Sequence, residues 1–121
     1  MLKQLFLILT ISILAGCSSD NRTLELGKGD DVIVNLEVLD KTGITKIEFQ
    51  ANGNIEVMNS DDLENHKIVS FGFENKGEGT FKVFVYSSND TISSEHYVEG
   101  GYRPELTGTK KKIEVKEHIG Y

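Results

Sequence analysis

The chain has 121 residues, with 13 lysine and arginine residues against 19 acidic ones and a formal net charge of −6. This acidic balance argues against nucleic acid as a partner, because nucleic-acid binding needs a basic face that displaces counterions. Cys17 is the only cysteine, which excludes an intrachain disulfide and leaves burial of apolar side chains to stabilise the domain.

The first 17 residues follow the pattern of a secretion signal. Lys3 supplies a positive charge, residues 5–14 are apolar apart from one threonine and one serine, and two small residues precede Cys17. A basic start, a short apolar stretch and small residues at the cleavage site are typical of signal peptides. The apolar stretch is shorter than the roughly 20 residues of a membrane-spanning helix. We therefore expect residues 1–16 to be a signal helix that is removed.

Leu14-Ala15-Gly16-Cys17 resembles the lipobox of bacterial lipoproteins, and this resemblance covers only the first 17 residues. It implies that the Cys17 thiol receives a diacylglyceryl group, that cleavage follows Gly16, and that the new amino end is acylated, for example with palmitate. It also implies that Ser18 directs the protein to the outer membrane of a Gram-negative cell. In a Gram-positive cell the same signal implies the outer face of the plasma membrane.

Two alternatives to the lipoprotein interpretation are an uncleaved anchor and an ordinary secreted protein. The anchor is disfavoured by its length. The secreted protein would carry a lone free thiol in an oxidising compartment, which is unusual.

Residues 17–23 are expected to be the lipidated cysteine and a short polar tether, followed by a domain over 24–121. The six residues after Cys17 span at most about 20 Å, which places the domain close to the bilayer. Without Lys3 the mature chain has a formal charge of −7. This charge argues against electrostatic attachment to anionic lipid, so the acyl chains must do the anchoring.

Apolar and polar residues alternate along much of the mature region, which predicts half-buried strands. The segments concerned are 32–38, 45–51, 69–73, 80–86 and 113–119. Over 45–51 the residues expected to face the core are Thr45, Ile47, Phe49 and Ala51. Turn-forming residues separate the strands at 27–30, 40–43, 52–53, 75–77, 88–90, 100–101 and 107–108.

Asn52-Gly53 predicts a two-residue type I′ turn, because both positions need a positive φ. It should join 44–50 and 55–58 in a hairpin. Residues 61–65 have the composition of a single helical turn.

Seven or eight short strands in about 100 residues predict an all-β fold, namely a small immunoglobulin-like β-sandwich of about seven strands. The segment 38–49, with its Asp-x-x-Gly-Ile turn leading into a strand, is similar to bacterial immunoglobulin-like modules. Residues 79–86 resemble a late central strand of the same fold. The resemblance concerns architecture and implies no activity.

No residue pattern indicates catalysis or a metal site. His66, His96 and His118 are not at metal-ligand spacing, and the acidic stretches 30–31 and 61–64 do not follow the EF-hand pattern. No serine lies in Gly-x-Ser-x-Gly or Ser-x-x-Lys, and on the lipoprotein interpretation the lipid occupies Cys17. We therefore expect no cofactor, no metal and no enzymatic activity.

The run Lys110-Lys111-Lys112 precedes the last predicted strand. The favoured interpretation is a charged guard at a strand end, where lysines discourage edge pairing. The alternative is a small contact with an anionic group such as a lipid headgroup.

The candidate partner-binding residues are aromatic and lie late in the chain. Phe81, Val83 and Val85 are expected to face the core, so Phe84 and Tyr86 point the other way. Tyrosine and arginine are over-represented at binding hot spots. We therefore group Phe84 and Tyr86 with Tyr97, Tyr102 and Arg103, and look for a partner at loop 99–106 and the strand before it. The alternatives are a strand covered on both sides, or Tyr86 packed at a corner of the sandwich.

The function that the sequence favours is a lipid-anchored, non-catalytic module of the bacterial envelope that binds another envelope protein or has a structural role. The alternative is a periplasmic carrier of a small ligand or an ion.

Overall fold

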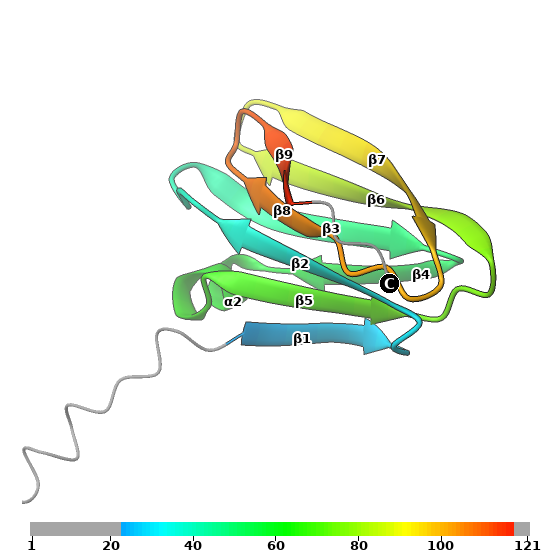
Figure 1. Cartoon of the computed structure of the whole chain (residues 1–121). Helices are drawn as coiled ribbons and strands as arrows, with labels where there is room; N and C mark the ends of the chain where they lie inside the picture. Colours follow the sequence, from blue (N-terminus) through cyan, green and yellow to red (C-terminus); the bar gives the residue numbers. More distant parts are fainter. Residues whose placement is uncertain (1–22, 118–121) are drawn as a thin grey trace, which may run out of the picture.

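The computed structural model describes residues 23–117. The expected signal peptide, Cys17 and the tether up to residue 22 lie outside the described residues, as do His118 and the end of the last predicted strand. The described chain is an all-β sandwich in which two sheets pack face to face (Figure 1). In chain order its elements are β1 (Thr23–Lys28), β2 (Val32–Val38), β3 (Ile44–Ala51), β4 (Asn54–Met58), α2 (Ser60–Asn65), β5 (Ile68–Phe73), β6 (Glu78–Ser87), β7 (Thr91–Glu99), β8 (Glu105–Gly108) and β9 (Ile113–Glu117).

The two sheets differ in their pairing. The five-stranded sheet has the order β1-β5-β2-β8-β9, and β1 with β5 and β2 with β8 are parallel pairs. The four-stranded sheet has the order β4-β3-β6-β7 and is antiparallel throughout. The prediction of an all-β sandwich is confirmed, with nine strands in the described residues.

The predicted hairpin at Asn52-Gly53 is confirmed. Asn52 has a φ of 48° and Gly53 a φ of 80°, the two positive values that a type I′ turn requires. Ala51 pairs directly with Asn54, so β3 and β4 are joined by two residues. The single helical turn is also present as α2, which Asn59 caps by accepting a hydrogen bond from the Asp62 N–H.

The prediction that Thr45 faces the core is wrong. The pairing of β3 with β6 shifts between Ile44 and Lys46, which is the sign of a β-bulge. The extra residue moves Thr45 to the surface, where its hydroxyl donates to the Tyr86 carbonyl at 3.2 Å. Ile44 packs against the core in its place.

Residues 107–108 were expected to form a turn, but they end strand β8, and the turn follows at 109–112. Glu105 and Leu106, expected in a loop, belong to the same strand. The physical reason is the parallel pairing with β2, in which Leu36 opposes Leu106 and buries it. Strands β1 and β7 were not predicted individually.

Four phenylalanines connect the two sheets through the core. The Phe49 and Phe71 rings stack across the sandwich with centroids 5.2 Å apart. Phe73 lies 5.2 Å from Phe71 and 6.3 Å from Phe81, so the rings form a continuous row. All four are fully buried. Aromatic contacts at these distances add to the free energy of burial.

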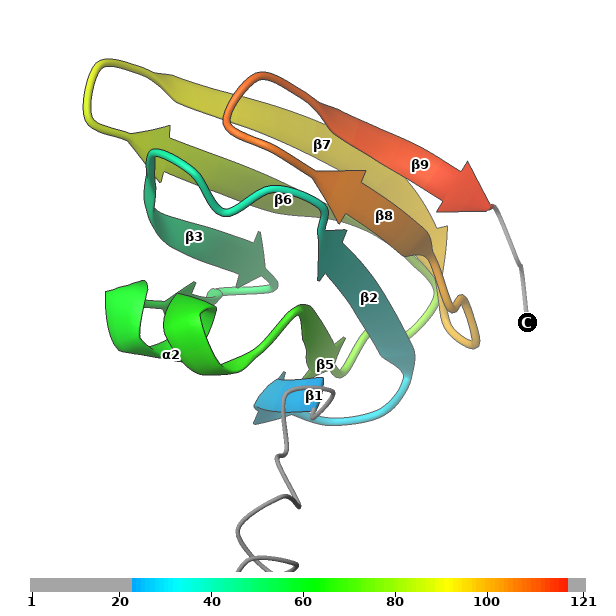
Figure 2. The ribbon, with the colours of Figure 1, turned by 90° about the vertical axis from the view of Figure 1, so that its left-hand side faces the viewer.

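The sandwich has two ends. We call the end at which the described chain begins the near end, and the opposite end the distal end. The near end holds Thr23 at the start of β1 and the loops 39–43, 59–67, 88–90 and 109–112 (Figure 2). The distal end holds the loops 29–31, 52–53, 74–77 and 100–104. All strands therefore run between the near end and the distal end.

A buried asparagine closes the distal end. Asn75 is 4% exposed, and its backbone N–H donates to Asp31 Oδ2 at 2.9 Å. Its side-chain amide donates to the Gly77 carbonyl at 2.8 Å, and the Asn52 amide donates to its Oδ1 at 3.0 Å. The Lys76 ammonium lies 3.2 Å from Asp31. These contacts hold three distal loops together, and the Asn75 N–H and Lys76 lower the pKa of Asp31.

We expect Phe71→Ala to lower the free energy of unfolding by about 3–5 kcal/mol, because it leaves a cavity in the middle of the phenylalanine row. Phe84→Ala is the matched control, because Phe84 is half-buried on the side of β6 that points away from the core. It should cost less than about 2 kcal/mol. Urea denaturation of both variants measures the difference. Equal losses would contradict the assignment of the row as the centre of the core.

We expect Asp31→Asn to lower the melting temperature at neutral pH and to matter less in acid. The pKa of Asp31 is lower in the folded protein than in the unfolded chain, so its carboxylate contributes stability above the unfolded pKa. This contribution is lost as the pH falls from about 5 towards 3. Melting curves across this range should show the wild type and variant converging. Asp30→Asn, at the adjacent exposed position, is the control, and a gap that is constant with pH would refute the explanation.

Candidate functional site

The side of the four-stranded sheet that points away from the core is uncovered by any other described element, and we call it the outer face. The buried residues of β3 and β6 alternate with those that form it. Its members are Ile55 and Val57 of β4, Lys46, Glu48 and Gln50 of β3, Glu78, Thr80, Lys82, Phe84 and Tyr86 of β6, and Thr91, Ser93, Glu95, Tyr97 and Glu99 of β7.

The outer face gathers much of the exposed apolar surface. Ile55 is 61% exposed, Val57 39% and Tyr97 48%, and these are three of the five large apolar side chains exposed among the described residues. The first two lie on one edge strand and Tyr97 on the other, with the half-buried Phe84 and Tyr86 between them. Exposed apolar residues clustered on one face, unlike scattered ones, indicate an interaction surface.

Phe84 and Tyr86 form a small aromatic platform. Their rings stack with centroids 6.4 Å apart. The Lys46 ammonium lies 4.4 Å from the centre of the Tyr86 ring, in the position of a cation–π contact. A covering layer over this strand, one of the alternatives that the sequence left open, is absent from residues 23–117.

The charges at the centre of the outer face balance, with Lys46 and Lys82 against Glu48 and Glu95, whereas its distal corner carries Glu78 and Glu99. In the strand register Lys82 is opposite Glu95, and Phe84 is opposite Glu48. Glu48 accepts a hydrogen bond from the Gln50 amide at 2.6 Å. A surface of mixed charges around aromatic side chains has the composition of a protein interface core with a polar rim.

The outside of the five-stranded sheet has a different character. Glu37 lies at its centre and pairs with Lys67 at 3.3 Å and Lys116 at 3.4 Å. Asn35, Ser70 and Thr107 lie around it on the same side. This polar network leaves the outer face of the four-stranded sheet as the more apolar of the two surfaces.

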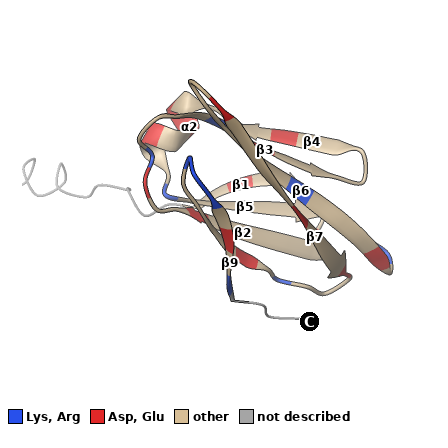
Figure 3. Ribbon diagram, turned by 90° about the horizontal axis from the view of Figure 1, so that it is seen from above, with Lys and Arg blue, Asp and Glu red and all other residues tan. Residues whose placement is uncertain are grey.

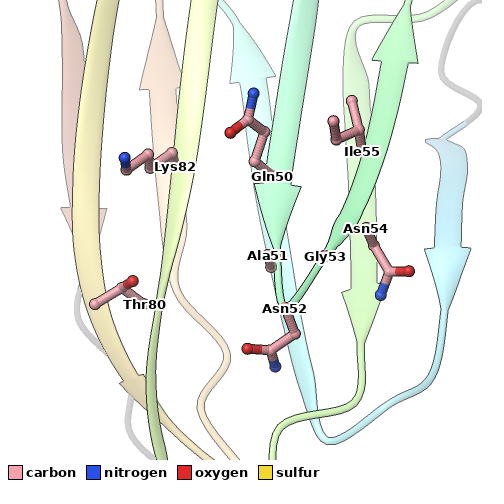
Figure 4. Close-up of a pocket in the computed structure, with 8 residues that line it drawn as sticks. All are labelled: Gln50, Ala51, Asn52, Gly53, Asn54, Ile55, Thr80 and Lys82. Carbon is pink, nitrogen blue, oxygen red and sulfur yellow. The ribbon is translucent and has the colours of Figure 1, made fainter.

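A shallow hollow of about 260 Å³ opens at the distal part of the outer face (Figure 4). It lies between the β3–β4 hairpin and β6, with Ile55 and Gln50 on one side and Lys82 and Thr80 on the other. Its lining combines one exposed aliphatic side chain with amide, hydroxyl and ammonium groups. Such a hollow suits the insertion of a partner side chain.

Tyr97 lies at the distal corner of the outer face, between two carboxylates. Its hydroxyl is 2.8 Å from Glu99 Oε2 and 3.0 Å from Glu78 Oε1. The single phenolic proton donates to one of them at a time. Both carboxylates disfavour the phenolate, Glu99 most strongly, and they raise the pKa of Tyr97. Tyr97 is therefore a neutral hydrogen-bond donor at physiological pH.

The structure separates the five predicted partner-binding residues. Phe84, Tyr86 and Tyr97 lie on the outer face, and Tyr102 packs edge-on against Tyr97 with centroids 6.3 Å apart. Arg103 is turned to the backbone, where it donates to the carbonyls of Asp31, Tyr102 and Asp30 at 2.9–3.1 Å. The guanidinium of Arg103 thus links the β7–β8 connection to the loop before β2.

Ile55 and Val57 were not among the site residues predicted from the sequence. The hairpin could have predicted their position, since a two-residue turn pairs residue 55 with 50 and residue 57 with 48. Glu48 and Gln50 were expected to point away from the core, so their partners had to share that side. The two residues thereby extend the predicted aromatic site to the opposite edge of the sheet.

Within residues 23–117 no group of three or more histidine, cysteine, aspartate or glutamate side chains has the geometry of a metal site. His66 Nδ1 lies 3.1 Å from the Asp62 carbonyl, and His96 Nε2 lies 2.8 Å from the Ser94 hydroxyl. The helical part of this described region includes no segment of the length and apolarity needed to cross a bilayer.

Comparison of the chain with protein-family models, with curated proteins and with solved structures found no significant match.

Proposed function

We propose that this chain is a bacterial lipoprotein whose β-sandwich is a non-catalytic binding module for another protein of the cell envelope. Cys17 supplies the anchor, and the outer face supplies the contact. The observation that carries the binding role is the concentration of Ile55, Val57 and Tyr97 on one uncovered sheet face. The sequence Leu14-Ala15-Gly16-Cys17 carries the anchoring role.

The size of the outer face suits a modest interface. Four strands about 4.8 Å apart, with about six residues each, cover roughly 15 Å by 20 Å. A standard interface buries about 800 Å² on each partner, so the flat face alone supports a weak or transient contact. A tighter complex would add the neighbouring β4 edge. Phe84 and Tyr86 at the centre are the expected energetic core, because buried aromatic residues dominate such contacts.

The anchor strengthens such a contact. A protein held on the same membrane as its partner meets it at a high effective concentration, so a weak interface is sufficient. This favours a partner that is itself in the membrane or attached to it.

We expect Cys17→Ser to release the protein from the membrane fraction or to leave it unprocessed, because the acyl chains have no other attachment point. Mass spectrometry of the amino end of the wild type should show a diacylglyceryl cysteine. Ser18→Ala, at the neighbouring position, should keep the lipid. An unmodified Cys17 at the mature amino end would refute the anchor.

We expect a photo-reactive residue at Val57 to capture an envelope protein in intact cells, whereas one at Val115 should not. Val115 is the matched control, since it is 46% exposed but lies on β9 in the other sheet. Adding Phe84→Ala to the Val57 probe should lower the yield about tenfold, the effect of removing a contact worth about 1.4 kcal/mol. Equal capture at both positions would overturn the assignment of the outer face. No capture, together with a melting temperature raised by a small molecule or ion, would favour a carrier.

A further inference from the structure

The near end of the sandwich combines basic and apolar side chains at the β8–β9 edge of the five-stranded sheet, opposite the β1 edge at which the chain enters. The Leu39 N–H donates to the Gly108 carbonyl at 3.1 Å, so the loops 39–43 and 109–112 lie side by side. Thr23, where the described chain begins, is at the same end of the sandwich (Figure 2). The six residues after Cys17 limit the distance of Thr23 from the lipid to about 20 Å.

The lysine run forms a structured turn at this end. The Thr109 N–H donates to the Lys112 carbonyl at 3.0 Å, and the Thr109 hydroxyl accepts from the N–H groups of Lys111 and Lys112 at 3.2 and 3.3 Å. These bonds place Lys110 and Lys111 at the exposed tip of the turn. Figure 3 shows this basic turn at the near end, apart from the acidic residues of α2.

The acids near the turn have other partners. Glu114 pairs with Lys112 at 3.0 Å, and Asp90 accepts the Thr91 N–H at 2.8 Å. Asp40 accepts the Thr42 N–H at 2.9 Å. Among the described residues neither Lys110 nor Lys111 has a carboxylate within the 4.0 Å of an ion pair. The Thr42 N–H lowers the pKa of Asp40, and Lys110 is near enough to that carboxyl to add to the effect. Neither lysine is held in an ion pair with a described residue, so both ammonium groups can contact an external anion.

A hollow of about 210 Å³ lies between the turn and the β6–β7 loop. Its lining residues are Gly43, Ser87, Ser88, Asn89, Asp90, Lys110 and Lys111. The side chain of Lys110 crosses Gly43, where an added Cβ would be 3.0 Å from its Cδ. Two ammonium groups with hydroxyl and amide donors around one hollow match the chemistry of a phosphate group, and the one carboxylate of the lining, Asp90, accepts the Thr91 N–H.

Leu39 adds an apolar element to the same end. It is 55% exposed and lies in the loop next to the lysine turn. Apolar side chains next to lysines are typical of protein surfaces that settle at the boundary between headgroups and acyl chains.

We propose that Leu39, the lysine turn and the hollow beside it bind the anionic phospholipid headgroups of the membrane that holds the anchor. This inference depends on the lipid anchor of the proposed function. The contact fixes the tilt of the domain, with the β8–β9 turn closer to the bilayer than α2 and the outer face turned sideways. A lysine near an anionic surface changes an equilibrium about fivefold, so two lysines change it about 30-fold.

The acidic charge of the chain is compatible with this contact. Two lysines are too few to recruit a domain of charge −7 from solution, which agrees with anchoring by acyl chains. Once the domain is tethered, contact with the membrane is intramolecular, and the same weak attraction is sufficient to orient it.

The experiment uses the full lipidated protein in vesicles of phosphatidylcholine with or without phosphatidylglycerol. Because the lipid occupies Cys17, an introduced cysteine is the only reactive thiol. Ser88→Cys at the near end and Asn54→Cys at the distal end each carry an environment-sensitive fluorophore, and a headgroup-attached quencher reports proximity. We expect at least about threefold stronger quenching at 88 than at 54 with phosphatidylglycerol present.

Lys110→Gln/Lys111→Gln should remove most of this difference. Lys28→Gln/Lys76→Gln, with the same loss of charge at the distal end, should preserve it. Equal quenching at the two positions, or a difference unaffected by phosphatidylglycerol or by the turn lysines, would overturn the proposal. Free phosphate that abolishes the difference at millimolar concentration would assign the hollow to a soluble anion instead. The mass of the amino end and the Val57 crosslink test the proposed function separately.

Discussion

The row of four phenylalanines between the sheets is the contact on which the rest of the structure depends. With a single cysteine the chain has no internal disulfide, so the stability of a small sandwich comes from burial. Phe49 and Phe81 come from one sheet and Phe71 and Phe73 from the other, and burying each side chain is worth about 1.5–3 kcal/mol. Each sheet therefore buries one of its two sides in the core. The character of the other side decides what the domain offers to partners.

Period-two alternation was sufficient to predict the class of fold and the direction of most side chains. Phe81, Val83 and Val85 face the core as expected, and the Asn52-Gly53 turn formed as its backbone requirements predicted. The failures came from pairing between distant segments. The bulge that turns Thr45 outward depends on the partner strand β6, and β8 exists because it pairs with β2 about 70 residues earlier. No local pattern encodes either contact.

The candidate site was predictable to the extent that it follows from alternation. Phe84, Tyr86 and Tyr97 share the outer face because each lies on the polar side of its strand, and the hairpin register extends the same reasoning to Ile55 and Val57. Arg103 belongs to another class. Its residue type suggested a hot spot for binding a partner. Its guanidinium instead donates hydrogen bonds to backbone carbonyls more than 70 residues away in sequence. Residue type alone does not distinguish an arginine that binds a partner from one that holds a loop.

The arrangement of the two ends explains how one small domain accommodates both an anchor and a binding face. The strands run from the near end, where Thr23 enters, to the distal end, which Asn75 and Arg103 close. Under the proposed anchoring, the outer face extends away from the bilayer along the strands. A partner on the same membrane would then approach from the side and meet the aromatic platform first. A partner reaching the distal loops would find a surface whose polar groups are largely bonded to one another. The chemistry of the surface thus favours lateral association over contact from above.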